Sequence, residues 1–182
     1  MGQPAGPWWQ LTSRGPDDTR AIGVTVGELA EAGDVVWLVG PLGSGKTTLV
    51  KGIAQGLGLD EQEVVSPTFL YVREVPGGRL PLFHVDGYRL LGRPAELVQA
   101  LAEELGLDYY LEQQGLVVVE WPEALAGLDE LARRERLEAH LLQPGQANST
   151  HRQLCLRGAG RRGQWLAEQV AGRHGGRRRE RC

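Results

Sequence analysis

Cysteine and long apolar runs are scarce in this chain, and both absences narrow the class of protein that it can be. The two cysteines, Cys155 and Cys182, are too few for a disulfide framework, so we expect both to stay reduced. No apolar run approaches the roughly 20 residues that a membrane-spanning helix needs. The first ten residues lack the positive charge and apolar core of a signal peptide. These absences predict a cytoplasmic protein with no membrane role.

Lysine is also rare, because the basic residues are 18 arginines and only two lysines, Lys46 and Lys51. A chain that uses arginine so consistently is expected to keep lysine where a slim ammonium group is needed. Lys46 lies inside the glycine-rich segment 40–47, and this position indicates a site that requires such a group.

The 182 residues are enough for one domain with a sizeable core. Charge is unevenly distributed along them. Residues 152–182 hold nine arginines against Glu168 and Glu180, so this segment carries +7 and the rest of the chain −10. We expect one domain over residues 1–157 and a basic C-terminal helix or tail over 158–182, partly disordered from Gly175 to Cys182. Such a tail is suited to contact RNA or an acidic partner.

The alternation of apolar and helical patterns predicts an α/β domain with a mainly parallel sheet flanked by helices. Continuous apolar runs at 35–39 and 116–119 are typical of strands buried on both faces. Further extended segments are expected at 8–12, 70–74, 80–85, 136–142 and 151–157, the last two paired. Helices are expected at 16–32, from the end of segment 40–47 to about 56, and at 94–105 and 164–171.

The segment Gly40-Pro41-Leu42-Gly43-Ser44-Gly45-Lys46-Thr47 matches the P-loop pattern G-x-x-x-x-G-K-[ST] between a predicted strand and a predicted helix. Glycines let several backbone N–H groups point into one concavity, and the helix start adds its positive dipole end. We therefore predict an ATPase in which Lys46 neutralises the β- and γ-phosphates and Thr47 binds Mg²⁺. The predicted phosphate-binding residues are Gly40, Leu42, Gly43, Ser44, Gly45, Lys46, Thr47 and Thr48.

Two carboxylates and one hydroxyl are predicted to complete this site. Glu120 follows the apolar run 116–119, the usual place of a Walker-B carboxylate, and Asp86 ends the strand 80–85. Both are predicted to act in catalysis and to hold Mg²⁺, and which of them binds it directly stays open. Thr68, in Ser66-Pro67-Thr68-Phe69, is the predicted sensor of the γ-phosphate. We interpret His84 as a strand residue that packs or hydrogen-bonds locally.

Other missing motifs exclude several P-loop families. Asparagine occurs once, at Asn148, so the guanine-reading motif N-K-x-D is absent and ATP is expected rather than GTP. No L-S-G-G-Q segment occurs, which argues against an ABC transporter ATPase. A small-molecule kinase stays open as the alternative, because Arg133-Arg134-Glu135-Arg136 could act as the arginine-rich lid of such an enzyme.

Four motifs occur in a fixed order: the P-loop through Thr48, then S-P-T-F at 66–69, then H-V-D-G-Y-R-L at 84–90, and then E-W-P-E at 120–123. Together they resemble the bacterial TsaE (YjeE) family, the ATPase of tRNA threonylcarbamoyladenosine biosynthesis. The resemblance covers roughly residues 11–142. The chain departs from the family pattern at Pro41, where an acidic residue is usual, and in its arginine-rich end after about residue 157.

The resemblance implies a P-loop NTPase-like fold that binds ATP and Mg²⁺ and hydrolyses ATP weakly without its partners. It implies binding to a TsaB–TsaD heterodimer and support of its repeated turnover in tRNA modification. Contact with tRNA is expected to be indirect, and the basic tail is the segment suited to it. Lys46, Thr47, Thr48, Asp86 and Glu120 match family positions linked to nucleotide, metal or activity, and Trp121 matches a residue beside the site.

Overall fold

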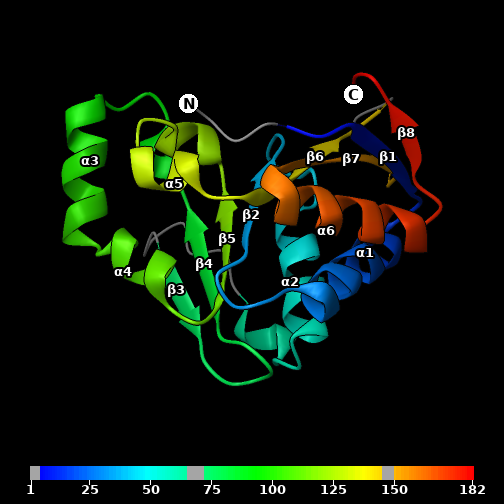
Figure 1. The fold of residues 1–182 in the computed structure, drawn as a ribbon, viewed down its shortest axis with the longest axis horizontal. Coiled ribbons are helices and arrows are strands. Elements are labelled where there is room, and N and C mark those ends of the chain that lie inside the picture. The colour runs from blue at the N-terminus through cyan, green and yellow to red at the C-terminus, as the bar shows by residue number, and fades with distance from the viewer. Residues whose placement is uncertain (1–4, 65–71, 145–149) are drawn as a thin grey trace.

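A computed structural model describes residues 5–64, 72–144 and 150–182, which form one eight-stranded sheet with helices on both faces (Figure 1). The strands are β1 (Trp8–Ser13), β2 (Val35–Val39), β3 (Val72–Val75), β4 (Leu82–Asp86), β5 (Leu116–Glu120), β6 (Arg136–Leu142), β7 (Arg152–Ala159) and β8 (Arg177–Arg179). The helices are α1 (Pro16–Leu29), α2 (Lys46–Gly56), α3 (Ala95–Glu104), α4 (Leu107–Glu112), α5 (Asp129–Arg133) and α6 (Gly160–Arg173). None of these helices is long and apolar enough to cross a membrane.

The strand order β3-β4-β5-β2-β6-β7-β1-β8 confirms the predicted α/β class and shows where the parallel pairing lies. Strands β4, β5, β2 and β6 run parallel to one another. The pairs β3–β4, β6–β7, β7–β1 and β1–β8 are antiparallel, so the parallel part is the centre of a mixed sheet. The carboxyl ends of β2, β4 and β5 therefore meet at one edge, which fixes the place of the candidate site.

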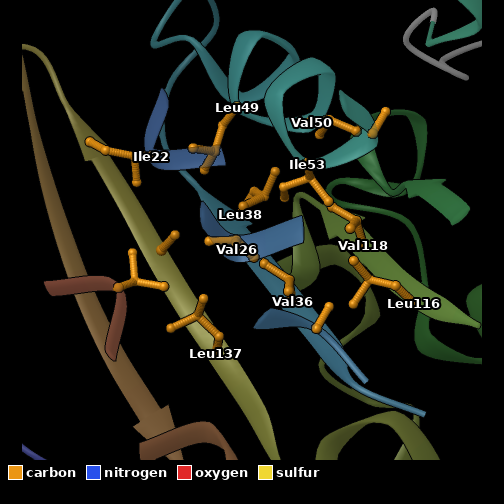
Figure 2. Packing of buried hydrophobic residues seen from close by; sticks show 14 of the residues in the cluster. Ile22, Val26, Val36, Leu38, Leu49, Val50, Ile53, Leu116, Val118 and Leu137 are labelled. Carbon is orange, nitrogen blue, oxygen red and sulfur yellow. The ribbon is translucent and has the colours of Figure 1, made fainter. Parts of the chain in front are cut away.

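Two apolar cores lie on opposite faces of the sheet. Figure 2 shows the larger one, where Leu38 and Val118 from the sheet pack beneath Ile53 of α2, with α1 and α6 beside it. Because strand side chains alternate, Val117 and Val119 project to the other face and pack under α3, α4 and α5. Because both faces of the sheet are covered by apolar cores, the sequences of both central strands are continuous apolar runs.

Helices α1 and α2 pack main chain against main chain at four glycines. A Cβ atom on Gly52 would lie 2.2 Å from a carbonyl oxygen of α1, and one on Gly23 would lie 2.3 Å from a carbonyl oxygen of α2. Gly27 and Gly56 repeat this close approach further along both helices. The contact fixes α2, the helix that starts with Lys46, against α1.

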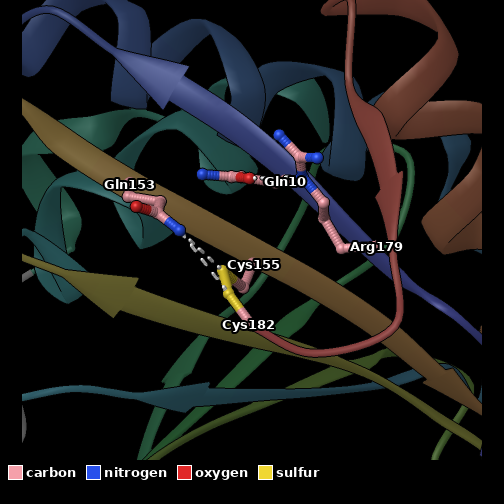
Figure 3. The surroundings of a disulfide bond; sticks show 5 residues. All are labelled: Gln10, Gln153, Cys155, Arg179 and Cys182. Carbon is pink, nitrogen blue, oxygen red and sulfur yellow. Dashed lines mark hydrogen bonds between the residues drawn. A yellow bond between two sulfur atoms is a disulfide. The ribbon is translucent and has the colours of Figure 1, made fainter.

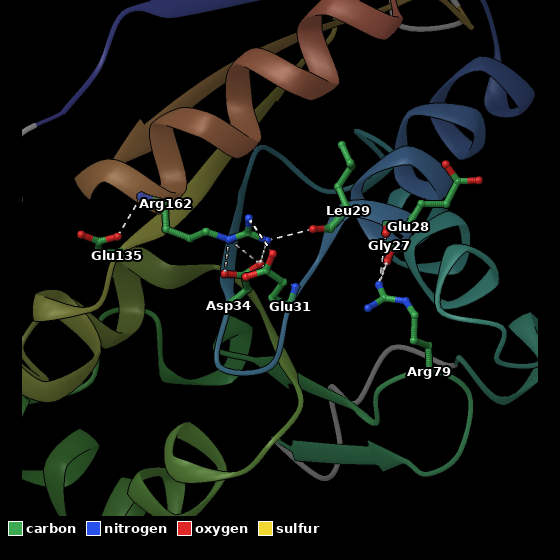
Figure 4. A network of polar contacts seen from close by, with 8 residues as sticks. All are labelled: Gly27, Glu28, Leu29, Glu31, Asp34, Arg79, Glu135 and Arg162. Atoms are coloured by element: carbon green, nitrogen blue, oxygen red, sulfur yellow. Dashed lines mark hydrogen bonds and ion pairs between the residues drawn. The ribbon is translucent and has the colours of Figure 1, made fainter.

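Residues 158–182 complete the same sheet and core, although the sequence predicted a separate helix or tail there. β7 continues through position 158 to Ala159, and α6 then packs on β6 and β7. Figure 4 shows one reason: the Arg162 guanidinium binds the Asp34 carboxylate at 2.7 Å and donates to the Leu29 carbonyl at 2.8 Å. The hydrogen bonds that Arg162 donates to the Asp34 carboxylate raise the pKa of Arg162, so its guanidinium group stays charged.

The last residues, which were predicted to be partly disordered, are placed by two further contacts. β8 pairs antiparallel with β1, whose outer edge would otherwise be open. Cys182 then forms a disulfide with Cys155 of β7, with their Cα atoms 6.0 Å apart (Figure 3). The expectation that both cysteines stay reduced is therefore wrong. The pairing of β8 with β1 brings Cys182 close to Cys155, although the two residues are 27 positions apart in the sequence.

Candidate functional site

The glycine-rich segment bends around a cavity of about 320 Å³ at the carboxyl ends of the central strands. The cavity is lined by Leu42, Gly43, Ser44, Gly45, Lys46, Thr47, Thr48, Asp86, Tyr88, Glu120 and Trp121. The structure therefore brings together the predicted site residues, with two exceptions. Gly40 begins the loop without lining the cavity, and Thr68 lies outside the residues that the structure describes.

Positive φ angles at glycines give the loop its shape. Gly40 has φ 154°, Gly43 has φ 75° and Gly45 has φ 102°. A Cβ atom on Gly40 would also lie 2.6 Å from the carbonyl oxygen of Leu141, so a side chain does not fit there. α2 begins directly after Gly45, which places the positive end of its dipole at the cavity.

An arginine on the outer side of the loop supports it. The Arg152 guanidinium, at the start of β7, donates to the carbonyl oxygens of Ser44 and Gly43, both at 3.0 Å. Sequence reasoning missed Arg152, because no motif links this position to the loop. Pro41 does not line the cavity either, and its carbonyl accepts the N–H of Ser44 at 3.2 Å. The absence of a backbone N–H at Pro41 therefore removes no hydrogen-bond donor from the cavity wall.

Lys46 is only 5% exposed and holds its charge at the loop. Its Nζ donates to the carbonyl oxygens of Gly40 at 2.7 Å and Pro41 at 3.1 Å, and it lies 3.9 Å from the ring centroid of Trp121. Burial lowers the pKa of Lys46, while the charge of nearby carboxylates, Glu120 foremost, acts in the opposite direction. Main-chain oxygens and an aromatic face therefore stabilise the buried ammonium group.

The two predicted carboxylates are register partners on β4 and β5, and each is 3% exposed. Glu120 Oε1 lies 2.9 Å from His84 Nε2 and 3.4 Å from Thr47 Oγ1. Asp86 Oδ1 accepts the N–H of Tyr88 at 2.9 Å. Glu120 is thus the carboxylate that the structure places against Thr47.

His84 reaches across to the neighbouring strand. It lies on the same face of the sheet as Glu120 and is 1% exposed. Since an ionised carboxylate only accepts hydrogen bonds, His84 donates to Glu120 through Nε2. Its other ring nitrogen, Nδ1, is buried and has no hydrogen-bond partner among the described residues. His84 thus makes the local hydrogen bond that the sequence indicated, and its partner is Glu120, the candidate catalytic carboxylate.

Trp121 and Tyr88 form an aromatic wall of the cavity that the sequence did not assign as such. Their ring centroids are 5.2 Å apart. Trp121 has φ 56°, a left-handed conformation that is strained for a residue with a side chain. This conformation turns its ring over Lys46 instead of continuing β5.

The arginines of segment 133–136, which could serve as a kinase lid, form ion pairs with acidic residues close to them in the sequence. The ion pairs are Arg133–Asp129 at 3.0 Å, Arg134–Glu130 at 2.7 Å and Arg136–Glu138 at 2.8 Å. None of these arginines lines the 320 Å³ cavity. The structure therefore offers no support for the kinase alternative from this segment.

Comparisons with known proteins agree with the four motifs. The family model described as "Threonylcarbamoyl adenosine biosynthesis protein TsaE" matches residues 13–154. A tRNA threonylcarbamoyladenosine biosynthesis protein TsaE from Bacillus subtilis is 37% identical, over 86% of this chain and 89% of that protein. The protein of the same name from Streptomyces coelicolor is 38% identical, over 84% and 97%.

A solved structure shows the same fold. The crystal structure of YdiB from Bacillus subtilis matches with a TM-score of 0.69 and 31% sequence identity, over 91% of this chain and 95% of that one. The fold is thus P-loop NTPase-like, as the position of the glycine-rich loop indicates. Taken with the family model over residues 13–154, these matches show that the chain belongs to the TsaE family of threonylcarbamoyl adenosine biosynthesis proteins.

Proposed function

We propose that this protein binds and hydrolyses ATP with Mg²⁺ as a cytoplasmic subunit of the bacterial machinery for tRNA N6-threonylcarbamoyladenosine. Its hydrolysis supports repeated turnover of the TsaB–TsaD complex and is weak without these partners. Membership of the TsaE family supports the pathway. The observation that carries the ATPase proposal is the cavity in which the P-loop, Lys46 and Glu120 meet.

The residues of this cavity fit a nucleoside triphosphate with its metal ion. Phosphate oxygens can replace the carbonyl acceptors of Lys46, because phosphate oxygens carry negative charge and attract the ammonium group more strongly than neutral carbonyl oxygens do. Thr47 and Glu120 offer the oxygen ligands that Mg²⁺ prefers. In the part of the chain that the structure describes, no three His, Cys, Asp or Glu side chains gather for an all-protein metal site. Mg²⁺ bound with ATP needs only one or two carboxylates and neutralises charge on the phosphates.

Each side chain has a distinct task in this proposal. Glu120, whose Oε1 is fixed by His84 Nε2, would hold the metal ion or orient a water molecule. Asp86, on the neighbouring strand, supplies the second carboxylate. The Trp121 ring covers the ammonium group of Lys46 and limits the access of water to it. Thr68 keeps its predicted role as a γ-phosphate sensor.

The role of Lys46 can be tested against the only other lysine of the chain. We expect Lys46→Ala to abolish ATP binding measured by calorimetry, because the variant loses the charge that faces the phosphates. Lys51→Ala is the matched control, since Lys51 lies in the same helix but does not line the cavity. Equal ATP affinity in the two variants would contradict the assignment of Lys46.

The ATPase and its partners are tested by mixing the purified protein with TsaB–TsaD and measuring ATP turnover. We expect stimulation of the natural protein, and a large loss of turnover with retained ATP binding for Glu120→Gln. Glu123→Gln, three residues along and exposed, is the control. Full ATP turnover by Glu120→Gln would show that the Glu120 carboxylate is not needed for hydrolysis. Absence of stimulation and of a complex would refute the role at TsaB–TsaD, while ATP binding by calorimetry would still be measured separately.

A further inference from the structure

The last strand of the sheet forms a strongly basic edge. Arg177, Arg178 and Arg179 make up β8, and Arg181 follows after the exposed Glu180; all four arginines are exposed. We call these four residues the arginine edge. β8 pairs only with β1, so its other side is the free edge of the sheet. In Figure 1 this edge lies at the far end of the molecule from α3.

A groove of about 490 Å³ runs beside this edge. Gln10, Thr12 and Arg14 line it from β1 and the loop after it, and His174, Arg177 and Arg179 line it from the chain end. Arg177 and Arg179 lie on one face of β8, roughly 7 Å apart along the strand. Three guanidinium groups therefore border one groove, and they come from segments far apart in the sequence.

These arginines differ from the other arginines of the molecule in their partners. Among the described residues, the ion pairs involve Arg20, Arg133, Arg134, Arg136, Arg157, Arg162 and Arg173. No ion pair in that part of the chain includes Arg14 or the arginine edge. Arg179 donates only to the neutral Gln10, at 2.8 Å (Figure 3).

Asp18 is the one acidic residue that lines the groove, and its carboxylate accepts the backbone N–H of Arg14 at 2.9 Å. Its charge offsets one of the three guanidinium groups, so the groove keeps a net charge of +2. Guanidinium groups that border one groove repel one another, and a bound anion relieves this repulsion. A groove with three unpaired guanidinium groups on an otherwise acidic protein therefore indicates a polyanionic partner.

RNA fits this surface better than an acidic protein does. Protein interfaces centre on apolar and aromatic side chains, whereas nucleic-acid interfaces are more polar and much more positive. None of the large apolar side chains that are exposed in the described residues lies in β8 or lines the groove. Guanidinium groups match phosphate in a bidentate way, and this surface carries arginines and no lysine.

We propose that the arginine edge and its groove bind the phosphate backbone of RNA, with tRNA as the class of substrate. The choice of tRNA rests on the pathway given in the proposed function, whereas the choice of phosphate rests on the charges of the groove. Such contacts carry no base readout, so this surface orients tRNA relative to the protein without selecting its sequence.

The test measures binding of purified tRNA to the full-length protein by fluorescence anisotropy over a series of salt concentrations. Arg177→Gln/Arg179→Gln removes two phosphate contacts, so we expect the slope of log K against log salt to fall in magnitude by about 1.5, and binding at 0.1 M salt to weaken roughly tenfold or more. Arg93→Gln/Arg161→Gln removes the same charge from exposed positions outside the groove and is expected to keep the slope. Arg14→Gln repeats the test without altering β8.

Three outcomes would overturn the proposal: no tRNA binding by the natural protein at low salt, an equal loss in the control pair, or competition by polyglutamate as strong as that by tRNA. The last outcome would assign the surface to an acidic protein. ATP turnover with TsaB–TsaD, measured without tRNA, is expected to be unchanged in Arg177→Gln/Arg179→Gln. A failure of RNA binding is thereby distinguished from a failure of the proposed ATPase.

Discussion

The glycine contact between α1 and α2 makes a sharp prediction about stability. In Gly52→Ala the new Cβ atom would lie 2.2 Å from the Arg20 carbonyl oxygen and 3.0 Å from the Gly23 Cα atom. Ordinary carbon–oxygen contacts are near 3.3 Å or longer, so the two helices must separate by about 1 Å. An extra methyl group in a well-packed core costs about 1–3 kcal/mol, and often more where main-chain atoms have to move.

The intrinsic preference of the helix acts in the opposite direction. Alanine is favoured over glycine by about 1 kcal/mol in a helix interior, so without the contact the substitution would stabilise the protein. Because separation of the helices also loosens the contact between Gly27 and Gly56, we expect a net loss of about 2 kcal/mol for Gly52→Ala. Gly172→Ala is the matched control, since a Cβ atom on this exposed glycine of α6 would have no atom within 4 Å. It is expected to gain about 0.5 kcal/mol.

Urea unfolding followed by tryptophan fluorescence measures both variants. The double variant Gly23→Ala/Gly52→Ala should lose less than the sum of its single changes, because the second methyl group enters a gap that the first has opened. If Gly52→Ala proved as stable as the natural protein, the main-chain contact between α1 and α2 would be refuted.

Three further predictions concern single side chains. His84→Leu removes the donor that fixes Glu120, so partner-stimulated ATP turnover should fall roughly tenfold or more with little change in ATP affinity. His84→Gln should retain most of the turnover. An equal loss in both variants would contradict a positioning role for His84. Burial lowers the pKa of His140 below its ordinary value of 6.5, so the unfolded chain binds a proton more readily and stability falls as the pH drops below about 6.5. His140→Gln should therefore lose less stability than the natural protein between pH 7.5 and 5.5 in urea titrations, and parallel losses would count against this. Reductant should lower the free energy of unfolding by about 3 kcal/mol in the natural protein but not in Cys155→Ser, and an equal response would argue against the Cys155–Cys182 bond.

The centre of the sheet and most of the candidate site could be predicted from the sequence because local signals determine them. The apolar runs at 35–39 and 116–119 mark strands buried on both faces, and the structure has both. The glycine spacing of the P-loop predicts a loop that its positive φ angles confirm. Asp86 and Glu120 are predicted to meet because parallel strands bring their carboxyl ends to one edge, and the two residues are register partners.

The features that the sequence did not predict depend on contacts between distant segments. Three consecutive arginines have no preference for a strand, and β8 forms because β1 presents a free edge. The short helix α4 lacks enough residues to show a period, so it was missed. Arg152 and the disulfide are likewise visible only once the antiparallel half of the sheet is assembled.

The guanidinium of Arg152, on β7, contacts the glycine-rich loop that follows β2. It holds the carbonyl oxygens of Gly43 and Ser44, while its own backbone is the register partner of Ser13, next to the arginine that opens the basic groove. One residue thus contacts the loop through its side chain and lies beside the groove through its backbone. Thermodynamic reciprocity sets a condition on any pair of ligands at the loop and the groove: the factor by which the first alters the affinity of the second equals the factor in return.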